Sequence, residues 1–445
     1  MDHSTVTTGA RAGDALAAAY AELEPTPRRV YRILGTLPVP VLDADLAAAA
    51  CALPWAEADW TLQILDEEQL VERVGHLAGD EDRLPLYRFG EAALAHAAVL
   101  SHGEEVVALD RLAVWILVCA RAVQRELAPH QEQPTLPPPG AHPGGAGLEF
   151  PFRPTDHAAM LEWLEHQGTN NLLPLLTALG ERGRSDLIWR TVDGWWPLFQ
   201  RRRPHSLWVG VHRVGLVAAR ADGDRAGERR MLLSGAIGLL DAGQHGEAAE
   251  WNTAAVEGAR AERDVRDEGQ ALHGLALGCL AEQRPEDATA LVAQAMARWE
   301  SCGYRRGEAL AQITLAQCVM NDRPQQAIDL LTCARTTLRD ESGPDHHLIR
   351  ALAIRGHAHL LAGDPAAAAG DLKRARDEFP EDDTSPWPAR TQTLLTQART
   401  VQQEHPTARA AATPSRTAPT DRSGPADDRL HQHDHQNPGG RSAPA

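Results

Sequence analysis

One helical packing pattern recurs every 40 residues through the second half of this chain. Three sets of small residues follow this interval to within one residue, namely Ala236, Ala276, Ala316, Gly356; Ala248, Ala288, Ala327, Ala368; and Ala255, Ala295, Ala334, Ala375. The acidic residues Glu228, Glu268 and Glu308 repeat in step. Small residues are needed where helices cross closely, and one such unit cannot bury its apolar face alone. The pattern therefore predicts stacked helical hairpins, an all-α solenoid whose units resemble tetratricopeptide repeats.

The composition supports helices and argues against polyanionic partners. Aromatic residues make up only 4 % of the chain, and alanine and leucine dominate, which favours helix over sheet. Lys373 is the one lysine beside 43 arginines, and the formal net charge is −17. Such a charge disfavours a general binder of nucleic acids or anionic membranes, so nucleic acid is an unlikely partner and no membrane partner is expected.

Cysteine spacing and hydropathy predict a cytoplasmic protein. The six cysteines form no C-x-x-C pair and lie within Ala/Leu-rich patterns: Cys51, Cys119, Cys279, Cys302, Cys318 and Cys333. We interpret them as buried thiols in a reducing compartment. The chain does not start with a basic region followed by an apolar stretch, and its most apolar run, residues 112–120, is too short to cross a bilayer.

Shifts in composition divide the chain into five parts. Residues 1–25 are a polar segment running into a short helix, 26–128 a compact module, 129–156 a Pro/Gly-rich linker, 157–380 the helical repeats, and 381–445 a tail predicted to be disordered. The first helices of the repeat region are rich in tryptophan and fit the 40-residue register poorly. We therefore expect irregular helical pairs to precede the regular units.

The compact module has the element order of a winged helix. Helices are predicted over residues 28–37, 44–52 behind the cap Asp43, and 55–70, where Ala56, Trp60, Ile64 and Leu65 would form the apolar face. Strand candidates at residues 70–74 and 86–89 follow, and then a long helix over 104–127. Three helices followed by a β-hairpin predict a degenerate winged helix packed against a long helix.

Together these parts resemble actinobacterial signal-transduction ATPases of the NB-ARC (STAND) class. The resemblance rests on Arg28-Arg29-Val30-Tyr31-Arg32-Ile33-Leu34-Gly35, on Glu162-Trp163-Leu164-Glu165 with Asn170-Asn171-Leu172-Leu173, and on Gly223-Asp224-Arg225 with Gly227-Glu228. It covers about residues 15–380. The family joins a nucleotide-binding module to a winged helix and tetratricopeptide-like repeats, so the resemblance implies a regulatory protein.

The nucleotide site of that family has no counterpart here. Its phosphate loop requires G-x-x-x-x-G-K-[ST], whereas this chain holds no Gly-Lys dipeptide. The stretch that would carry the family's nucleotide-sensing histidine, residues 87–92, lacks histidine, and no room for the module precedes residue 26. We therefore expect a regulator without the nucleotide-binding domain, with no cofactor and no ATP hydrolysis.

The repeat register places a candidate binding surface on the concave face. Three positions of each first helix should line this face, and they hold Arg230, Gln270, His273, Gln317, Arg350 and His357, among the apolar Leu277, Ile313 and Met320. Such a mixture suits a protein or peptide partner, because polar groups fix orientation and apolar groups supply area. The competing interpretation is a set of ordinary solvated helix faces.

Other candidate sites are weaker. The helix that would read DNA in a winged helix, residues 54–74, carries six acidic residues against Arg73 alone, which a polyanion would repel. The run Arg201-Arg202-Arg203 is either a solvated loop or a contact for an acidic partner. His431, His433 and His435 alternate in the tail without a second shell to fix metal geometry, so no metal is expected.

No set of residues has a catalytic spacing that is more convincing than chance. The chain has 20 histidines and 61 acidic residues, a number that produces accidental spacings. We expect a non-enzymatic scaffold or regulatory protein that binds a partner through its repeats. The alternative is a transcriptional regulator that uses the winged helix to bind DNA.

Overall fold

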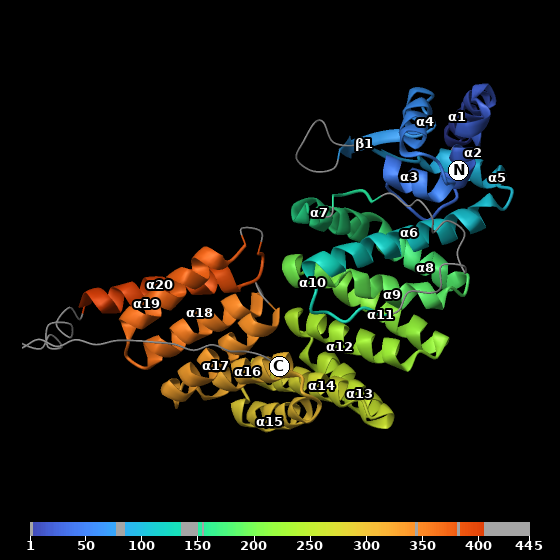
Figure 1. The fold of residues 1–445 in the computed structure, drawn as a ribbon. Helices are drawn as coiled ribbons and strands as arrows, with labels where there is room; N and C mark the ends of the chain where they lie inside the picture. Colours follow the sequence, from blue (N-terminus) through green and yellow to red (C-terminus); the bar gives the residue numbers. More distant parts are fainter. Residues whose placement is uncertain are drawn as a thin grey trace, which may run out of the picture.

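The computed structural model describes residues 3–76, 85–134, 150–153, 155–342, 346–380 and 383–404. Within these residues the chain is almost entirely helical, and its helices follow one another along an arc from the N-terminal elements to α20 (Figure 1). No helix in this part of the chain is both long enough and apolar enough to cross a lipid bilayer. The predicted linker residues 135–149 and the tail residues 405–445 lie outside the described residues.

The N-terminal module comprises α1 to α6. Its elements are α1 (His3–Glu22), α2 (Pro25–Leu34), α3 (Ala44–Cys51), α4 (Trp55–Glu67), β1 (Glu72–His76), β2 (Pro85–Arg88), α5 (Glu91–Val99) and α6 (Glu104–Leu127). The long helix agrees with its predicted bounds, and the Asp43 carboxylate caps α3 by accepting from the Leu46 N–H at 2.7 Å. The short N-terminal helix was wrong, because α1 has 20 residues and its Tyr20 packs against Tyr31.

The strands form a small antiparallel hairpin after the three helices. Glu72 pairs with Arg88, and Leu42 forms a further β-bridge with Tyr87, so the hairpin is joined to the segment before α3. The order of elements is the one predicted. The predicted apolar face of α4 was half right: Leu65 is buried and Ile64 packs against the core, but Ala56 is exposed and Trp60 is 50 % exposed. Ala58 and Leu62 are the buried residues that the prediction missed.

Irregular helices connect this module to the regular repeats. They are α7 (His157–Gln167), the π-helical turn η2 (Gly168–Leu172), α8 (Leu173–Glu181), α9 (Ser185–Gly194), α10 (Trp196–Arg202) and α11 (His205–Asp222). The buried Asn171 donates to the Val41 carbonyl at 2.9 Å and accepts from the Val41 N–H at 3.2 Å. Because one amide side chain satisfies both backbone groups of Val41, it fixes the loop before α3 against η2.

Four helical hairpins then repeat with the predicted period. They are α12 (Arg225–Asp241) with α13 (His245–Glu262), α14 (Val265–Ala281) with α15 (Pro285–Cys302), α16 (Arg305–Val319) with α17 (Pro324–Ser342), and α18 (His346–Leu361) with α19 (Pro365–Glu378). The eleven alanines of the three predicted registers are 0 to 1 % exposed. At the remaining position, a Cβ on Gly356 would lie 2.6 Å from Leu372 Cγ, so only glycine fits. The solenoid is therefore packed through the residues that define its period.

The turns between units also repeat. Gly223 ends α11 with φ of +70°, and Asp224 then caps α12 by accepting from the Gly227 N–H at 2.9 Å. Forty residues later, Asp264 caps α14 by accepting from the Asp267 N–H at 3.0 Å. The motif that resembles the inter-repeat turns of the NB-ARC family thus forms a turn in this chain.

The predicted tail begins with a helix. Residues of α20 (Trp387–Glu404) pack against α19, and Thr391, Leu394, Leu395 and Ala398 are buried in that contact. Placing the end of the ordered chain at residue 380 was therefore wrong. The helix covers the last hairpin, whose apolar side would otherwise face water, as terminal capping elements do in solenoids.

We predict that replacing Ala276 with leucine destabilises the protein by about 1–3 kcal/mol, because a close-packed helix contact has no room for three added carbon atoms. Chemical denaturation of both proteins measures this difference. Ala249→Leu is the control, since Ala249 is exposed on α13 and its replacement should change stability by less than about 0.5 kcal/mol. Equal stability of the two variants would contradict the packing.

Candidate functional site

A groove of about 920 Å³ runs along the inner side of the helical repeats. We call it the concave groove. It lies along the first helices of the four hairpins, α12, α14, α16 and α18, and is bounded by α10 and by the start of α20. All six residues predicted to bind a partner line this groove: Arg230, Gln270, His273, Gln317, Arg350 and His357. The register read from the sequence therefore brings them together on one surface.

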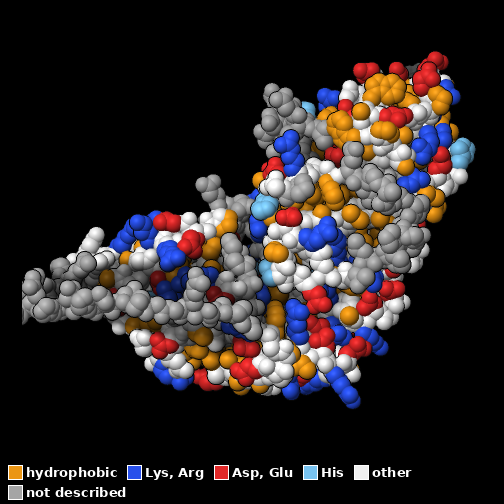
Figure 2. Space-filling model, in the orientation of Figure 1, with side chains coloured by type: hydrophobic (Ala, Val, Ile, Leu, Met, Phe, Trp, Pro, Cys, Tyr) orange, Lys and Arg blue, Asp and Glu red, His pale blue; other side chains and the backbone are white. Residues whose placement is uncertain are grey.

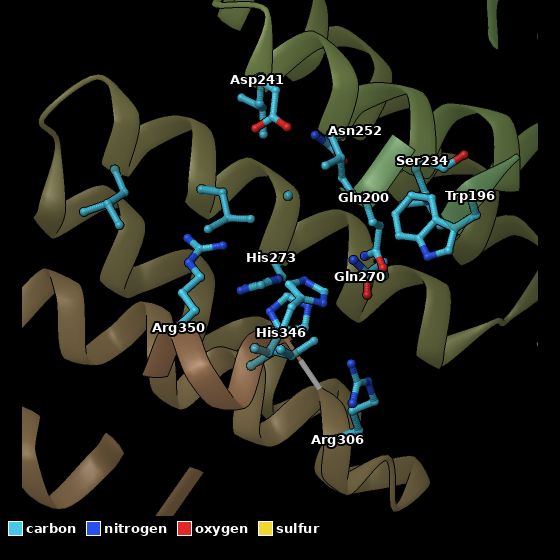
Figure 3. Close-up of a pocket in the computed structure, with 18 of the residues that line it drawn as sticks. Trp196, Gln200, Ser234, Asp241, Asn252, Gln270, His273, Arg306, His346 and Arg350 are labelled. Atoms are coloured by element: carbon cyan, nitrogen blue, oxygen red, sulfur yellow. The ribbon is translucent and has the colours of Figure 1, made fainter. Parts of the chain in front are cut away.

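Figure 3 shows how these side chains are distributed. Arg350, His273 and Gln270 project into the same space from the repeats, and Trp196 and Gln200 of α10 face them from another side. Leu277 and Met320 also line the groove, as predicted. Ile313 was misplaced, because its side chain is 4 % exposed and belongs to the core shared by α16, α17 and α18.

Arg230 is not a free groove cation. Its guanidinium donates from Nε to the Asp193 carboxylate, which is buried and also accepts from Arg121 Nη1 at 2.5 Å. Burial opposes ionisation of Asp193, but the charges of Arg230 and Arg121 outweigh it, so the pKa of this carboxyl lies below its ordinary value. Arg230 therefore joins α12 to α9 and α6, and it is a structural residue as well as part of the groove wall.

His273 is also occupied by an internal contact. Its Nε2 lies 2.8 Å from the Thr314 hydroxyl of the next unit, and its ring packs against Trp299. Burial, with a contribution from the charge of Arg350, lowers the pKa of His273 to about 4, so the ring is neutral at neutral pH. The residue therefore supports the contact between α14 and α16, and only its edge faces the groove.

Three of the predicted residues present hydrogen-bonding groups to the groove. Gln270, Gln317 and His357 are partly exposed. The Gln317 Oε1 atom is inaccessible to water and has no hydrogen-bond partner among the described residues. Burial, and then the charge of Arg390, lowers the pKa of His357 below its ordinary value. These side chains can donate to or accept from a segment laid in the groove.

Part of the predicted linker already lies in the groove. His130, Gln131, Glu132 and Pro134, which follow α6, line it beside α12 and α14. The Glu132 carboxylate lies 2.8 Å from Arg266 Nη1, and the Glu132 carbonyl accepts from Arg230 Nη2. This contact could not be predicted, because a Pro/Gly-rich stretch has no periodicity from which a packing partner can be inferred.

The start of α20 supplies further groove residues that sequence reasoning missed. The Arg350 guanidinium lies over the Trp387 ring, with Cζ 4.7 Å from the ring centroid, and Arg390 lies over the same ring at 5.3 Å. The available signal was the pair Trp387-Pro388 followed by Leu394, Leu395 and Ala398, a helix start with an apolar stripe.

The groove is cationic although the chain is acidic. Among the described residues that line it are seven arginines and four acidic residues, namely Arg203, Arg229, Arg230, Arg266, Arg306, Arg350, Arg390 and Glu132, Asp241, Asp264, Asp267. The lining thus carries a formal charge of +3, in contrast to −17 for the whole chain.

Other features singled out in the sequence have separate outcomes. Arg201 and Arg202 end α10 and do not form a loop, while Arg203 pairs with Asp241 at 2.5 Å. The cysteines are all free thiols, but burial of all six was wrong, because Cys302 and Cys333 are exposed. His431, His433 and His435 lie outside the described residues.

Surface hydrophobic side chains gather over the N-terminal module (Figure 2), where Val99 is 85 % exposed, Trp60 50 % and Val106 48 %. None of them lines the concave groove. The chain thus has two surfaces of different character, an apolar one over α4 to α6 and a polar, cationic one inside the solenoid.

No protein-family model matches this chain. The chain is similar to the regulatory protein AfsR of Streptomyces griseus, with 27 % identity over 309 residues, and to AfsR of Streptomyces coelicolor, with 26 % over 328 residues. These matches cover 67 % and 70 % of this chain but 30 % and 31 % of the relatives. The chain therefore spans less than a third of the length of the curated relatives it matches.

The fold has similarity to a solved structure of a signal transduction ATPase with numerous domains (STAND) that carries a tetratricopeptide repeat sensor, from Pyrococcus horikoshii. The TM-score is 0.34 at 13 % identity, and the match covers 85 % of this chain and 66 % of that chain. The described residues of this chain form helical repeats, and its sequence is distantly similar to that of the AfsR regulators.

Proposed function

We propose that this chain is a non-enzymatic regulatory protein of the cytoplasm that captures a segment of a partner protein in its concave groove. The observation that carries the proposal is the groove itself, formed by the first helices of four successive hairpins and lined by partly exposed polar side chains. Repeat proteins with such surfaces bind extended or helical segments along them. The distant similarity to proteins named as regulatory supports the same class of function.

The part of the groove between α12 and α14 already holds a segment of the chain itself. Residues 130–134 are held there through a backbone carbonyl and a carboxylate, the two groups that any peptide with an acidic residue offers. The groove is therefore suited to peptide backbone. The part between α16, α18 and α20 remains lined by Gln317, His357 and Arg350.

Photo-crosslinking from matched glutamine positions tests the proposal. Benzoylphenylalanine replaces Gln317 on α16, which lines the groove, or Gln325 on α17, which is exposed outside it. In native cells, we expect light-dependent crosslinks to one partner from position 317 and none to that partner from position 325. Crosslinks from position 325 alone would place the binding surface on the outer helices.

We predict that the protein binds neither ATP nor ADP, because it contains no phosphate-loop sequence. Millimolar nucleotide with magnesium should leave the melting temperature unchanged, whereas a ligand present at 100 times its dissociation constant would add about 2.7 kcal/mol of stability. A reproducible rise of several degrees would refute this prediction.

A second candidate function, DNA binding, is favoured only by the element order of the N-terminal module. We predict that it is absent, since α4 and its flanks carry Glu57, Asp59, Asp66, Glu67, Glu68 and Glu72, and Arg73 lies 3.6 Å from the carboxylate of Asp66. The full chain should not retard duplex DNA at physiological salt in an anisotropy titration. Sequence-dependent binding at nanomolar concentration would instead support a transcriptional regulator.

A further inference from the structure

The open end of the groove brings together cations from three distant parts of the chain. Arg350 comes from α18, Arg390 from α20, and Arg203 from the turn after α10. Thr384, just before α20, donates to the carbonyls of Arg201 at 3.3 Å and Arg202 at 3.1 Å. The segment before α20 therefore contacts the end of α10, and this contact brings the three arginines to the same end of the groove.

Little negative charge offsets this cluster. The charge of Asp241 favours the protonated form of Arg350, but the Asp241 carboxylate already pairs with Arg203 at 2.5 Å. From the described residues, no carboxylate lies within ion-pair distance of Arg350 or Arg390, and the buried Arg350 Nε has no hydrogen-bond partner. Burial, together with the charges of Arg203 and Arg390, lowers the pKa of Arg350 to about 10. The charged form of Arg350 is thus under-stabilised in the free protein.

Neither Arg350 nor Arg390 forms an ion pair with a described residue, so their N–H donors can serve a ligand. A guanidinium placed over an aromatic ring uses its planar face, whereas its five N–H donors lie in the plane and point outward. Both guanidinium groups lie over one ring, that of Trp387, at 4.7 and 5.3 Å. A carboxylate beside this ring would accept from both cations and relieve their mutual repulsion.

The other end of the groove shows the corresponding arrangement already filled. There the Glu132 carboxylate lies 2.8 Å from Arg266, and the adjoining carbonyl accepts from Arg230. Glu132 is supplied by the chain itself, but at the Arg350 end the described chain supplies no such carboxylate. The contacts of Glu132 therefore indicate that the Arg350 end of the groove would also bind a carboxylate.

We propose that the concave groove binds an extended acidic segment of a partner protein, and that Arg350 and Arg390 hold one of its carboxylates beside Trp387. This inference rests on the function proposed above. The net charge of −17 does not prevent such binding, because the Debye length is about 8 Å at physiological ionic strength, so distant acidic residues are screened more than the groove arginines.

A binding measurement with defined peptides tests the proposal. The probe is fluorescein-labelled hexaglutamate, its comparison is labelled hexaglutamine, and the full chain is titrated by anisotropy. We expect hexaglutamate to bind with an affinity that falls with salt, and hexaglutamine not to bind. The double variant Arg350→Gln, Arg390→Gln should bind hexaglutamate about 10- to 100-fold more weakly, the factor for losing charge-assisted hydrogen bonds.

A second double variant controls for charge alone. Arg374→Gln with Arg399→Gln makes the same change at exposed positions on α19 and α20 that do not line the groove, and should alter binding less than about twofold. The melting temperature of the Arg350, Arg390 variant should not fall, since two neighbouring like charges are removed.

Three results would overturn the inference. They are equal loss of hexaglutamate binding in both double variants, no loss in either, or tighter binding of inorganic phosphate than of hexaglutamate at Arg350 and Arg390, which would make the site a phosphate site. None of these would remove the function proposed for the groove, which fails only if crosslinking from Gln317 fails. The two proposals are therefore tested separately.

Discussion

Asp193→Ala is expected to lower the free energy of unfolding by about 3–5 kcal/mol, the usual result of removing one partner of a buried ion pair. Asp193 is 3 % exposed and accepts from Arg121, which is 2 % exposed. Without the carboxylate, the Arg121 charge would be left buried and uncompensated. Arg230 would lose its partner on α9 as well, so the contact between the solenoid and α6 would be weakened.

Urea denaturation with Asp186→Ala as control measures this effect. Asp186 lies on the same helix and pairs with Arg184 at the surface, so its replacement should cost less than about 1 kcal/mol. Because the folded pKa of Asp193 is depressed, its contribution is present above the unfolded pKa and is lost as the pH falls through the folded value. Equal effects of the two substitutions at neutral pH would show that the buried network adds nothing.

Two buried histidines should make the protein sensitive to mild acid. His212 Nδ1 lies 2.8 Å from the Trp208 carbonyl, and its Nε2 lies 2.7 Å from the Ser234 hydroxyl. Burial lowers the pKa of both His212 and His273 to about 4. Between about pH 6.5 and pH 4, the unfolded chain binds more protons than the folded one. Stability should therefore fall across this range by up to about 3 kcal/mol for each histidine, at 1.36 kcal/mol per pKa unit.

Unfolding free energies measured between pH 7.5 and pH 4 test this prediction. His212→Gln should flatten the curve between about pH 6.5 and pH 4, although its stability at pH 7.5 will be lower because the packing changes. His205→Gln, at an exposed position at the start of α11, should leave the slope unchanged. A parallel curve for His212→Gln would mean that this ring is protonated in the folded state.

The repeats could be predicted from sequence because the small residues that pack their helices recur at a fixed interval along the chain. Ala276 and its equivalents must be small wherever helices cross, so spacing alone identified the hairpins and the first helices that line the groove. The lining residues Gln270, Gln317 and Arg350 followed from the same register.

The rest of the site depends on contacts between distant segments. Arg230 was taken as an exposed cation because its partner Asp193 lies 37 residues away, in a helix outside the 40-residue register. Glu132 lies in a stretch with no periodicity, and α20 has few apolar residues and follows a turn-rich segment, so its composition resembled disorder. The 40-residue repeat pattern does not specify contacts with segments that lie outside the repeats.

Hydrogen–deuterium exchange of the full chain, alone and with the partner recovered by crosslinking at position 317, tests binding in the concave groove most directly. We expect the partner to protect the groove-lining helices α12, α14, α16 and α18, while the outer helices α13, α15, α17 and α19 exchange as in the free protein. Protection confined to the outer helices, or to α4 and the exposed surface of the N-terminal module, would contradict binding in the concave groove.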